Sequence, residues 1–287
     1  MTNRNSLLPP IHVHPILLVF VFISFITGTF VQLSIILAIV LFHEFGHFAM
    51  AKWFNWRIQK IMLWIFGGVM ETDEHGNRPM YEDFLVTIAG PFQHVFIYVF
   101  LFVAGNFQFI PNHILDLLFF YNTVILLFNA LPIYPLDGGK IVLLCLSMVF
   151  SFRTAYDTVI LFSLVATFLA LVTMFFFPFS LGVFLIMLFL LMENRLEWKR
   201  RYYVFIRFLL KRYEGNASVH AVRPISVSHQ MKLMDVFSQF QRNKKHSIYI
   251  TYPNQERKLI DENDCLHTYF YEKNYVKTIG ELGSGLM

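Results

Sequence analysis

Long apolar runs dominate the first two thirds of the chain, and polar residues return in ordinary numbers only near its end. From about Ile11 to Met192 the sequence is almost continuously apolar, whereas after Glu193 it reads like a soluble protein. A helix of about 20 apolar residues spans the hydrocarbon core of a bilayer, so these runs predict membrane-spanning helices. Six spans fit between short breaks at glycine, asparagine and proline: 11–30, 32–54, 84–104, 114–135, 156–176 and 179–193.

The pattern predicts an α-helical polytopic membrane protein of about six transmembrane helices, with a small cytosolic α+β domain at its carboxyl end. We expect residues 1–194 to form the membrane domain and residues 195–223 to be a basic helix or linker on the membrane surface. Basic residues after a last span lie favourably on anionic lipid. Residues 224–287 then form the soluble domain.

Residues 58–82 are only partly apolar, and the apolar part is too short for a span. Their apolar stretch, Ile61–Val69, includes Gly67 and Gly68, and it predicts a hairpin or re-entrant element. Bare strand edges are not tolerated in lipid, so the hairpin must be buried against protein. An extended substrate could pair with such a strand by strand addition, and we expect Gly67, Gly68 and Pro135 to contact substrate.

The composition agrees with a membrane domain and indicates its orientation. Of the 287 residues, 56% are hydrophobic and 15% are charged, compared with about 25% charged in soluble domains. The loops 27–31, 104–113 and 176–179 contain no lysine or arginine, so the positive-inside rule places both termini in the cytosol. The net charge of +4 then reflects topology rather than nucleic-acid binding, and the two distant cysteines predict no disulfide.

The candidate chemistry begins with His43-Glu44-Phe45-Gly46-His47, which lies inside the second predicted span. Two histidines four residues apart share one face of a helix, where they can bind one metal ion while the glutamate between them acts as a general base. Each ionisable group in a span costs at least about 2.5–3.5 kcal/mol on insertion scales. A bound cation facing the protein interior would compensate for these groups.

A second polar constellation follows about 90 residues later, in the segment 129–139, Asn-Ala-Leu-Pro-Ile-Tyr-Pro-Leu-Asp-Gly-Gly. Its prolines break a predicted helix near membrane depth, and irregular backbone there must be covered by protein or line a wet cavity. Asp137 falls at a depth similar to that of His43 and His47. It is either a third metal ligand, which would leave an open position for water, or the cap of a helix that begins near Gly139.

These two motifs resemble the site-2 protease family of intramembrane zinc metalloproteases, and the six-span layout with a carboxy-terminal domain resembles its sporulation branch. The resemblance implies that His43, His47 and Asp137 bind one Zn²⁺ and that Glu44 is the general base. It also implies that Asn129 supports the substrate or the transition-state oxyanion. One departure is visible at His94, which stands where many members have the asparagine of a Gly-Pro-x-x-Asn motif.

The resemblance further implies a biological setting. The substrate would be a membrane-associated protein, a sporulation sigma-factor precursor, and membrane-protein regulators or inhibitors would control the enzyme. The location would be the mother-cell membrane that surrounds the forespore, in a multi-pass arrangement.

The carboxy-terminal tail predicts a short strand at 225–227, a helix over Met231–Arg242, a strand over His246–Tyr252 and a helix from near Glu262. This β-α-β-(β)-α order resembles a single CBS domain, which implies self-association into a homo-oligomer and binding of ATP or another adenine nucleotide. A substrate-docking or purely structural role stays open, since the tail has no phosphate-cradling glycine loop.

Two further classes of function stay open beside the zinc endopeptidase. One is a catalytically inactive membrane scaffold or transporter, against which the intact Glu44 and Asp137 argue. The other is a membrane di-iron desaturase or hydroxylase, which needs several histidine boxes where this chain has one. Metal analysis separates the three, because they predict one zinc, no metal or two irons per chain.

Overall fold

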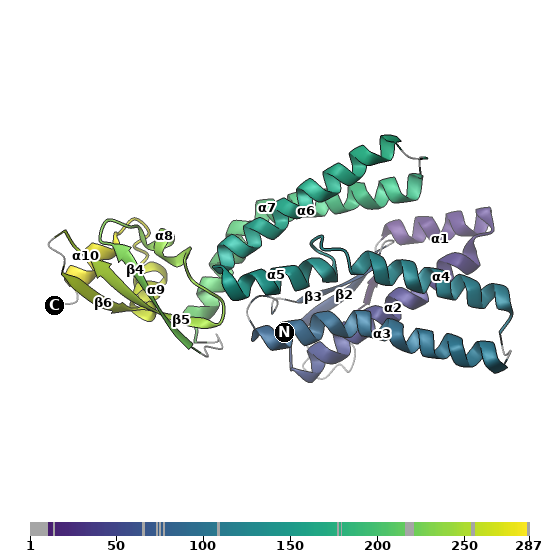
Figure 1. Cartoon of the computed structure of the whole chain (residues 1–287), viewed down its shortest axis with the longest axis horizontal. Coiled ribbons are helices and arrows are strands. Elements are labelled where there is room, and N and C mark those ends of the chain that lie inside the picture. Colours follow the sequence, from purple (N-terminus) through teal and green to yellow (C-terminus); the bar gives the residue numbers. More distant parts are fainter. Residues whose placement is uncertain are drawn as a thin grey trace. The chain divides into compact units, whose positions relative to one another are not determined.

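The computed structural model is mostly helical and contains two small sheets (Figure 1). It describes residues 11–13, 15–64, 67–72, 74, 76, 78–107, 110–176, 178, 180–215, 221–253 and 256–285. These residues form two compact units. The first takes in the described part of Met1–His75 with Tyr81–Pro132 and Leu136–Ile141. The second takes in Gly76–Met80, Ile133–Pro135 and the described part of Val142–Met287.

Four apolar helices and the start of a fifth build the first unit. They are α1 (Pro15–Thr27), α2 (Phe30–Trp53), α3 (Met80–Phe107), α4 (Asn112–Asn129) and the first turn of α5 (Asp137–Val149). Gly28, at a φ of +73°, separates α1 from α2, a conformation that glycine adopts without steric cost. Pro111 precedes α4, because proline fits a helix start, where no backbone donor is needed.

The first unit also holds a three-stranded sheet in the order β1-β2-β3 (Ile11–Val13, Ile58–Trp64 and Gly67–Thr72). The antiparallel pair β2–β3 confirms the predicted hairpin, with Leu63 opposite Gly68 and Trp64 opposite Gly67; residues 65–66 lie outside the described part. The prediction of a span from residue 11 is wrong at its start. Residues 11–13 instead pair in parallel with β2, whose free edge offers main-chain hydrogen bonds.

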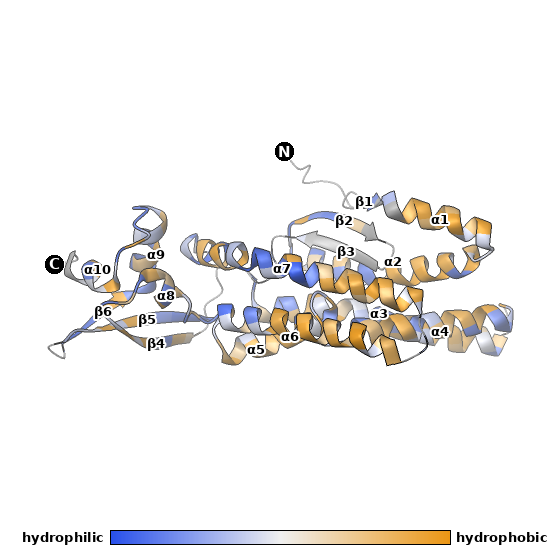
Figure 2. Cartoon of the chain, turned by 90° about the horizontal axis from the view of Figure 1, so that it is seen from above, coloured by the Kyte–Doolittle hydropathy of each residue, from blue (hydrophilic) through white to orange (hydrophobic). Residues whose placement is uncertain are grey.

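Two long helices of the second unit lie side by side, α6 (Phe152–Thr173) and α7 (Leu181–Tyr213), joined through the 3₁₀ turn η1 (Met174–Phe176) (Figure 1). The helix α7 passes without a break through the predicted end of the sixth span at residue 193. Figure 2 shows its apolar first half giving way to a hydrophilic middle and then to a mixed last part. The predicted surface segment 195–223 thus begins inside a continuous helix, and its residues 216–220 lie outside the described part.

Within the described residues, three helices are long and apolar enough to cross a membrane: Phe30–Trp53, Met80–Phe107 and Phe152–Phe176. The helix over Leu17–Thr27 is apolar but shorter. These helices support the assignment of a membrane protein. The total of six spans stays a prediction.

The carboxy-terminal part of the second unit is a small α+β fold. Its sheet has the order β4-β5-β6 (Ala221–Ser228, Lys244–Thr251 and Arg257–Asp261), and its helices are α8 (Leu233–Phe237), α9 (Glu262–Phe270) and α10 (Ile279–Gly285). The strand-helix-strand-strand-helix order follows the prediction, but the predicted helix over Met231–Arg242 is too long. Turns follow Phe237, and they let the Phe240 ring stack on His246 with centroids 4.7 Å apart. Burial of this aromatic pair outweighs the helical periodicity.

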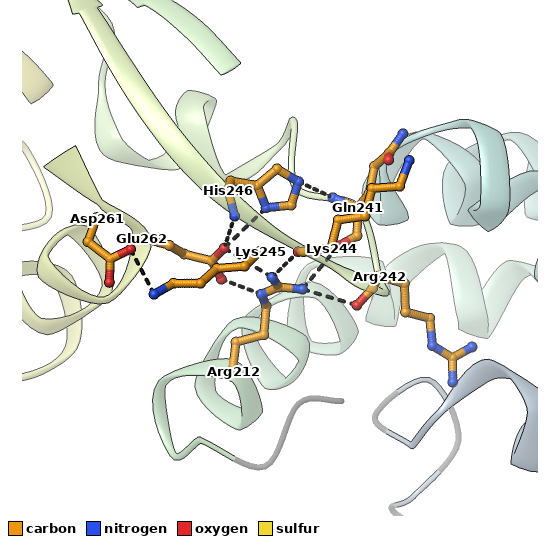
Figure 3. Close-up of polar contacts among 8 residues, drawn as sticks. All are labelled: Arg212, Gln241, Arg242, Lys244, Lys245, His246, Asp261 and Glu262. Atoms are coloured by element: carbon orange, nitrogen blue, oxygen red, sulfur yellow. Dashed lines mark hydrogen bonds and ion pairs between the residues drawn. The ribbon is translucent and has the colours of Figure 1, made fainter. Parts of the chain in front are cut away.

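A buried ionic network joins the end of α7 to this α+β fold (Figure 3). The Arg212 guanidinium donates to Glu262 Oε1 at 2.5 Å and Oε2 at 3.0 Å, and to the main-chain carbonyls of Gln241 and Arg242 at 3.0 and 3.1 Å. Glu262 also accepts from the main-chain N–H of His246 at 2.8 Å. Such a buried pair is held in place because every polar atom of its guanidinium has a partner.

Candidate metal centre

The two histidines of α2 and the first residue of α5 converge inside the first unit. His43 Nε2 and His47 Nε2 lie 3.1 Å apart, and Asp137 Oδ2 lies 3.1 Å from each. All three side chains are buried. The residues that sequence reasoning selected from two distant motifs therefore form a triangle of donor atoms.

The size of this triangle fits a zinc ion. With zinc–ligand distances of about 2.0–2.1 Å, the ligand atoms of a tetrahedral site lie about 3.3–3.4 Å apart, and the triangle is only slightly tighter. Three protein ligands leave the fourth position open, which is typical of catalytic rather than structural zinc sites.

The hydrogen bonding of His47 also favours a cation at the centre. Its Nδ1 donates to the main-chain carbonyl of Val86 at 2.7 Å, because a carbonyl oxygen can only accept. In the neutral ring, Nε2 then carries a lone pair that faces the Asp137 carboxylate. Two lone-pair donors at 3.1 Å repel each other unless a cation or a second ring proton lies between them.

The loop between α4 and α5 places Asp137 at the start of α5. Its Oδ2 faces the two histidines, while its Oδ1 accepts from Lys140 Nζ at 3.2 Å. The next residue, Gly138, lies against the carbonyls of Ala130 and Leu131 so closely that an added Cβ would overlap them. The two carboxylate oxygens therefore have separate partners, one at the donor triangle and one at Lys140.

Glu44 belongs to the same cluster. It is 8% exposed, and ligand atoms of His43, Glu44 and His47 all lie within 4.8 Å of one another. A carboxylate beside the two-histidine face can exchange protons with a molecule at the open position.

Two glycines allow α2 and α3 to approach at the site, and sequence reasoning assigned a role to neither. An added Cβ on Gly46 would overlap the Ala89 carbonyl, and one on Gly90 would overlap the imidazole of His47. The sequence signal was present, since Gly46 lies inside the histidine motif and Gly90 precedes Pro91.

Sequence reasoning also missed Asn122, which lies buried on α4. It pairs with His94 of α3, whose other ring nitrogen lies 3.1 Å from His43 Nδ1. The signal for Asn122 was that it is the one amide within the mostly apolar stretch Leu117–Phe128 of α4.

The structure does not bring the other predicted site residues to the donor triangle by any contact within its described residues. The Asn129 amide donates to the Ile125 carbonyl of its own helix at 3.0 Å. Pro135 follows a cis peptide bond, and Gly67 and Gly68 lie in β3, which runs alongside α2. Their roles stay predictions.

The fold and the site together define the class: a helical membrane protein whose buried donor set is that of a zinc hydrolase. A family model described as Peptidase family M50 matches residues 31–113 and 107–174. The chain is 38% identical over 287 residues to Stage IV sporulation protein FB of Bacillus subtilis (strain 168), covering 98% of this chain and 99% of that one. The chain belongs to peptidase family M50, and its resemblance to the site-2 proteases is confirmed.

Two further similarities agree with this assignment. Over 111 residues the chain is 33% identical to a zinc metalloprotease of Methanocaldococcus jannaschii, covering 38% of this chain and 32% of that one. The solved structure of a site-2 protease from Methanocaldococcus jannaschii superposes with a TM-score of 0.56 at 24% identity, covering 68% of this chain and 93% of that one. At that identity the structure shows a shared fold.

Proposed function

We propose that this chain is an intramembrane zinc endopeptidase that cuts a membrane-associated protein near the cytosolic face. The observation that carries the proposal is the triangle formed by His43, His47 and Asp137, with Glu44 beside it. The two histidines and Glu44 lie on α2, a helix long enough to cross the membrane. Membership of peptidase family M50 supports the same reaction.

The residues divide the work of amide hydrolysis. His43, His47 and Asp137 would hold one Zn²⁺, which when bound supplies a Lewis acid and lowers the pKa of water to about 7. Glu44 takes the proton of the attacking water and passes it to the leaving amine, a contribution of about 10²–10⁴-fold. Asn129 is a neutral donor for the developing oxyanion, after its side chain turns away from the Ile125 carbonyl.

The substrate must present an extended segment, because a transmembrane helix hides its carbonyls in its own hydrogen bonds. The strand β3 lies at one edge of its sheet and alongside α2. We assign it the role of pairing with that segment by strand addition. Gly67 and Gly68 would keep the edge accessible, and Pro135 would contact the substrate.

The similarity to a sporulation protein of Bacillus subtilis supports a sporulation sigma-factor precursor as the substrate. Membrane-protein regulators or inhibitors, the membrane around the forespore and cytosolic termini on a six-span domain at 1–194 belong to the same proposal. The basic segment 195–223 would connect that domain to the tail.

The tail over 224–287 would act as a CBS-like regulatory domain that binds ATP or another adenine nucleotide and self-associates. The proposal places that ligand at the open surface hollow lined by His229, Tyr252 and Gly280. Equilibrium dialysis of the full chain against ATP tests this, and absence of binding at millimolar ATP would remove the nucleotide.

The deciding experiment compares Glu44→Gln with wild type on a membrane-anchored sigma-factor precursor. Wild type should cleave it and hold one zinc per chain, whereas Glu44→Gln should keep the zinc and lose cleavage by about 10²–10⁴-fold. Phe45→Leu is the matched control, since Phe45 is the next residue of α2 and is 52% exposed; it should cleave normally. Equal cleavage by wild type and Glu44→Gln, or wild type without zinc, would refute the proposed mechanism.

A further inference from the structure

A pair of buried polar side chains stands behind one of the two histidines of the donor triangle. His94 on α3 and Asn122 on α4 are both fully buried. His94 Nε2 lies 3.1 Å from His43 Nδ1, and His94 Nδ1 lies 2.7 Å from Asn122 Oδ1. Buried polar groups are costly unless they are paired, so this chain of contacts needs an explanation.

The donors and acceptors along this chain have one consistent assignment. The Asn122 amide nitrogen donates to the His94 main-chain carbonyl at 3.4 Å, which leaves Asn122 Oδ1 as the acceptor from His94 Nδ1–H. In a neutral imidazole the other nitrogen then accepts. His94 Nε2 therefore accepts from His43 Nδ1–H, and His43 Nε2 carries the free lone pair.

We infer that Asn122 and His94 are positioning residues that hold His43 in the tautomer whose Nε2 lone pair faces the metal. The inference rests on the proposed function, because it concerns the same zinc site. Neither residue touches the metal: both ring nitrogens of His94 are occupied, one by His43 and one by Asn122. They act only through His43.

The comparison with His47 shows why His43 needs such a device. His47 receives its orientation from a main-chain carbonyl, that of Val86, which cannot change its role as an acceptor. His43 faces another imidazole, which could be either donor or acceptor. Asn122 removes that ambiguity, since its amide is itself oriented by the His94 carbonyl. Partners of this kind raise ligand basicity and hold the ring plane.

The position of His94 also acquires a reason. His94 stands at the place of the asparagine in the Gly-Pro-x-x-Asn motif that many members of the family have. A buried histidine at this place needs an acceptor for its second ring nitrogen. Asn122, 28 residues further along the chain, supplies that acceptor. We therefore expect the two positions to depend on each other energetically.

The test measures zinc affinity by competition with a chelator on the full-length protein in detergent. His94→Leu and Asn122→Leu should each lower the affinity by about 10–100-fold, the usual loss for an outer partner of a metal ligand. His94→Gln should stay within about threefold of wild type, because its side-chain carbonyl can accept from His43 Nδ1–H. The double variant with His94→Gln and Asn122→Leu should bind zinc as tightly as His94→Gln alone. A glutamine side chain has no tautomers, so Asn122 has none to select.

Tyr98→Phe is the matched control, since the Tyr98 hydroxyl bonds Thr123 Oγ1 at 2.8 Å and joins the same two helices without touching His43. Its zinc affinity should equal that of wild type. The inference is wrong if Asn122→Leu lowers affinity equally in the wild-type and His94→Gln backgrounds, or if His94→Leu binds zinc as tightly as wild type. Failure of the proposed function is distinct, because wild type itself would then bind no zinc.

Discussion

At the scale of single residues, the site depends on two glycines as well as on the candidate metal ligands. Gly90 leaves room for the His47 ring, and Gly46 leaves room for the carbonyl of Ala89. A helix interior normally disfavours glycine by roughly 0.5–1 kcal/mol relative to alanine. The two glycines therefore trade local helix stability for a close approach of α2 and α3 at the ligands.

Gly90→Ala tests this close approach. The new Cβ would overlap the Nε2 and Cε1 atoms of His47, so the ring must leave its position and zinc affinity should fall by about tenfold or more. Gly105→Ala on the same helix is the control, because its Cβ would meet Leu115 at an ordinary 4.0 Å. Chelator competition reads out both variants, and equal affinities would show that the site does not need the glycine.

At the scale of elements, the small sheet of the first unit is the feature that most separates this chain from a plain helical bundle. Its strand β2 is covered on one side by β1 and on the other by β3, so β3 keeps one unpaired edge among the described residues. Exposed strand edges are templates for pairing with another chain. The unpaired edge of β3 runs alongside α2. Binding of substrate at this edge would explain why it is left unpaired.

Gly67→Val and Gly68→Val test the role of this edge. We expect cleavage to fall by about tenfold, because a branched side chain hinders an incoming strand, whereas zinc content should not change. Gly182→Val is the control, because an added Cβ at Gly182 meets nothing within 4 Å. Normal cleavage by both strand variants would exclude strand addition at this edge.

At the scale of the whole molecule, α7 connects two regions that sequence analysis treated as separate. Near its middle, the Asn194 amide donates to the Tyr134 carbonyl at 2.5 Å, in the loop that leads to Asp137. Near its end, Arg212 enters the buried network of the α+β fold (Figure 3). One continuous helix therefore links the tail to the loop that precedes a candidate ligand.

The network at Arg212 predicts how the stability of the tail depends on its charged side chains. Arg212→Met leaves Glu262 buried without its main partner and should lower the free energy of unfolding of the tail by about 3–5 kcal/mol. Lys245→Met is the control in Figure 3, since the Lys245–Asp261 pair is partly exposed, at 38% and 41%, and worth about 0–1 kcal/mol. Hydrogen exchange of the β5 amides in the full chain measures both, and equal effects would contradict the assignment.

The same network predicts a loss of stability in acid. Burial raises the pKa of Glu262, but hydrogen bonds from His246 and Arg212 and the charge of Arg212 outweigh it and lower the pKa below 4.5. The stabilisation is therefore complete above about pH 4.5 and is lost as pH falls through the lower folded pKa. In Glu262→Gln, the β5 amides should exchange faster at pH 7 and show less dependence on acid than in wild type. Identical acid dependence of the two proteins would rule out Glu262 as its source.

Local patterns determine much of this protein. Apolar runs of helical length predict the membrane helices, because lipid accepts only segments that satisfy their own backbone. The four-residue spacing of His43 and His47 predicts a shared metal, because helix geometry places them on one face. The prolines before Asp137 predict that the helix ends there, because proline removes a backbone donor.

Only the tertiary structure decides what depends on the approach of distant segments. It brings Asp137 to both histidines, places His94 and Asn122 behind His43, and pairs residues 11–13 with β2. It also shortens the predicted helix at Met231–Arg242, because packing of Phe240 outweighs a weak local preference. A sequence records each residue's own propensity, whereas a metal site and its hydrogen bonds depend on distances between elements that no local pattern encodes.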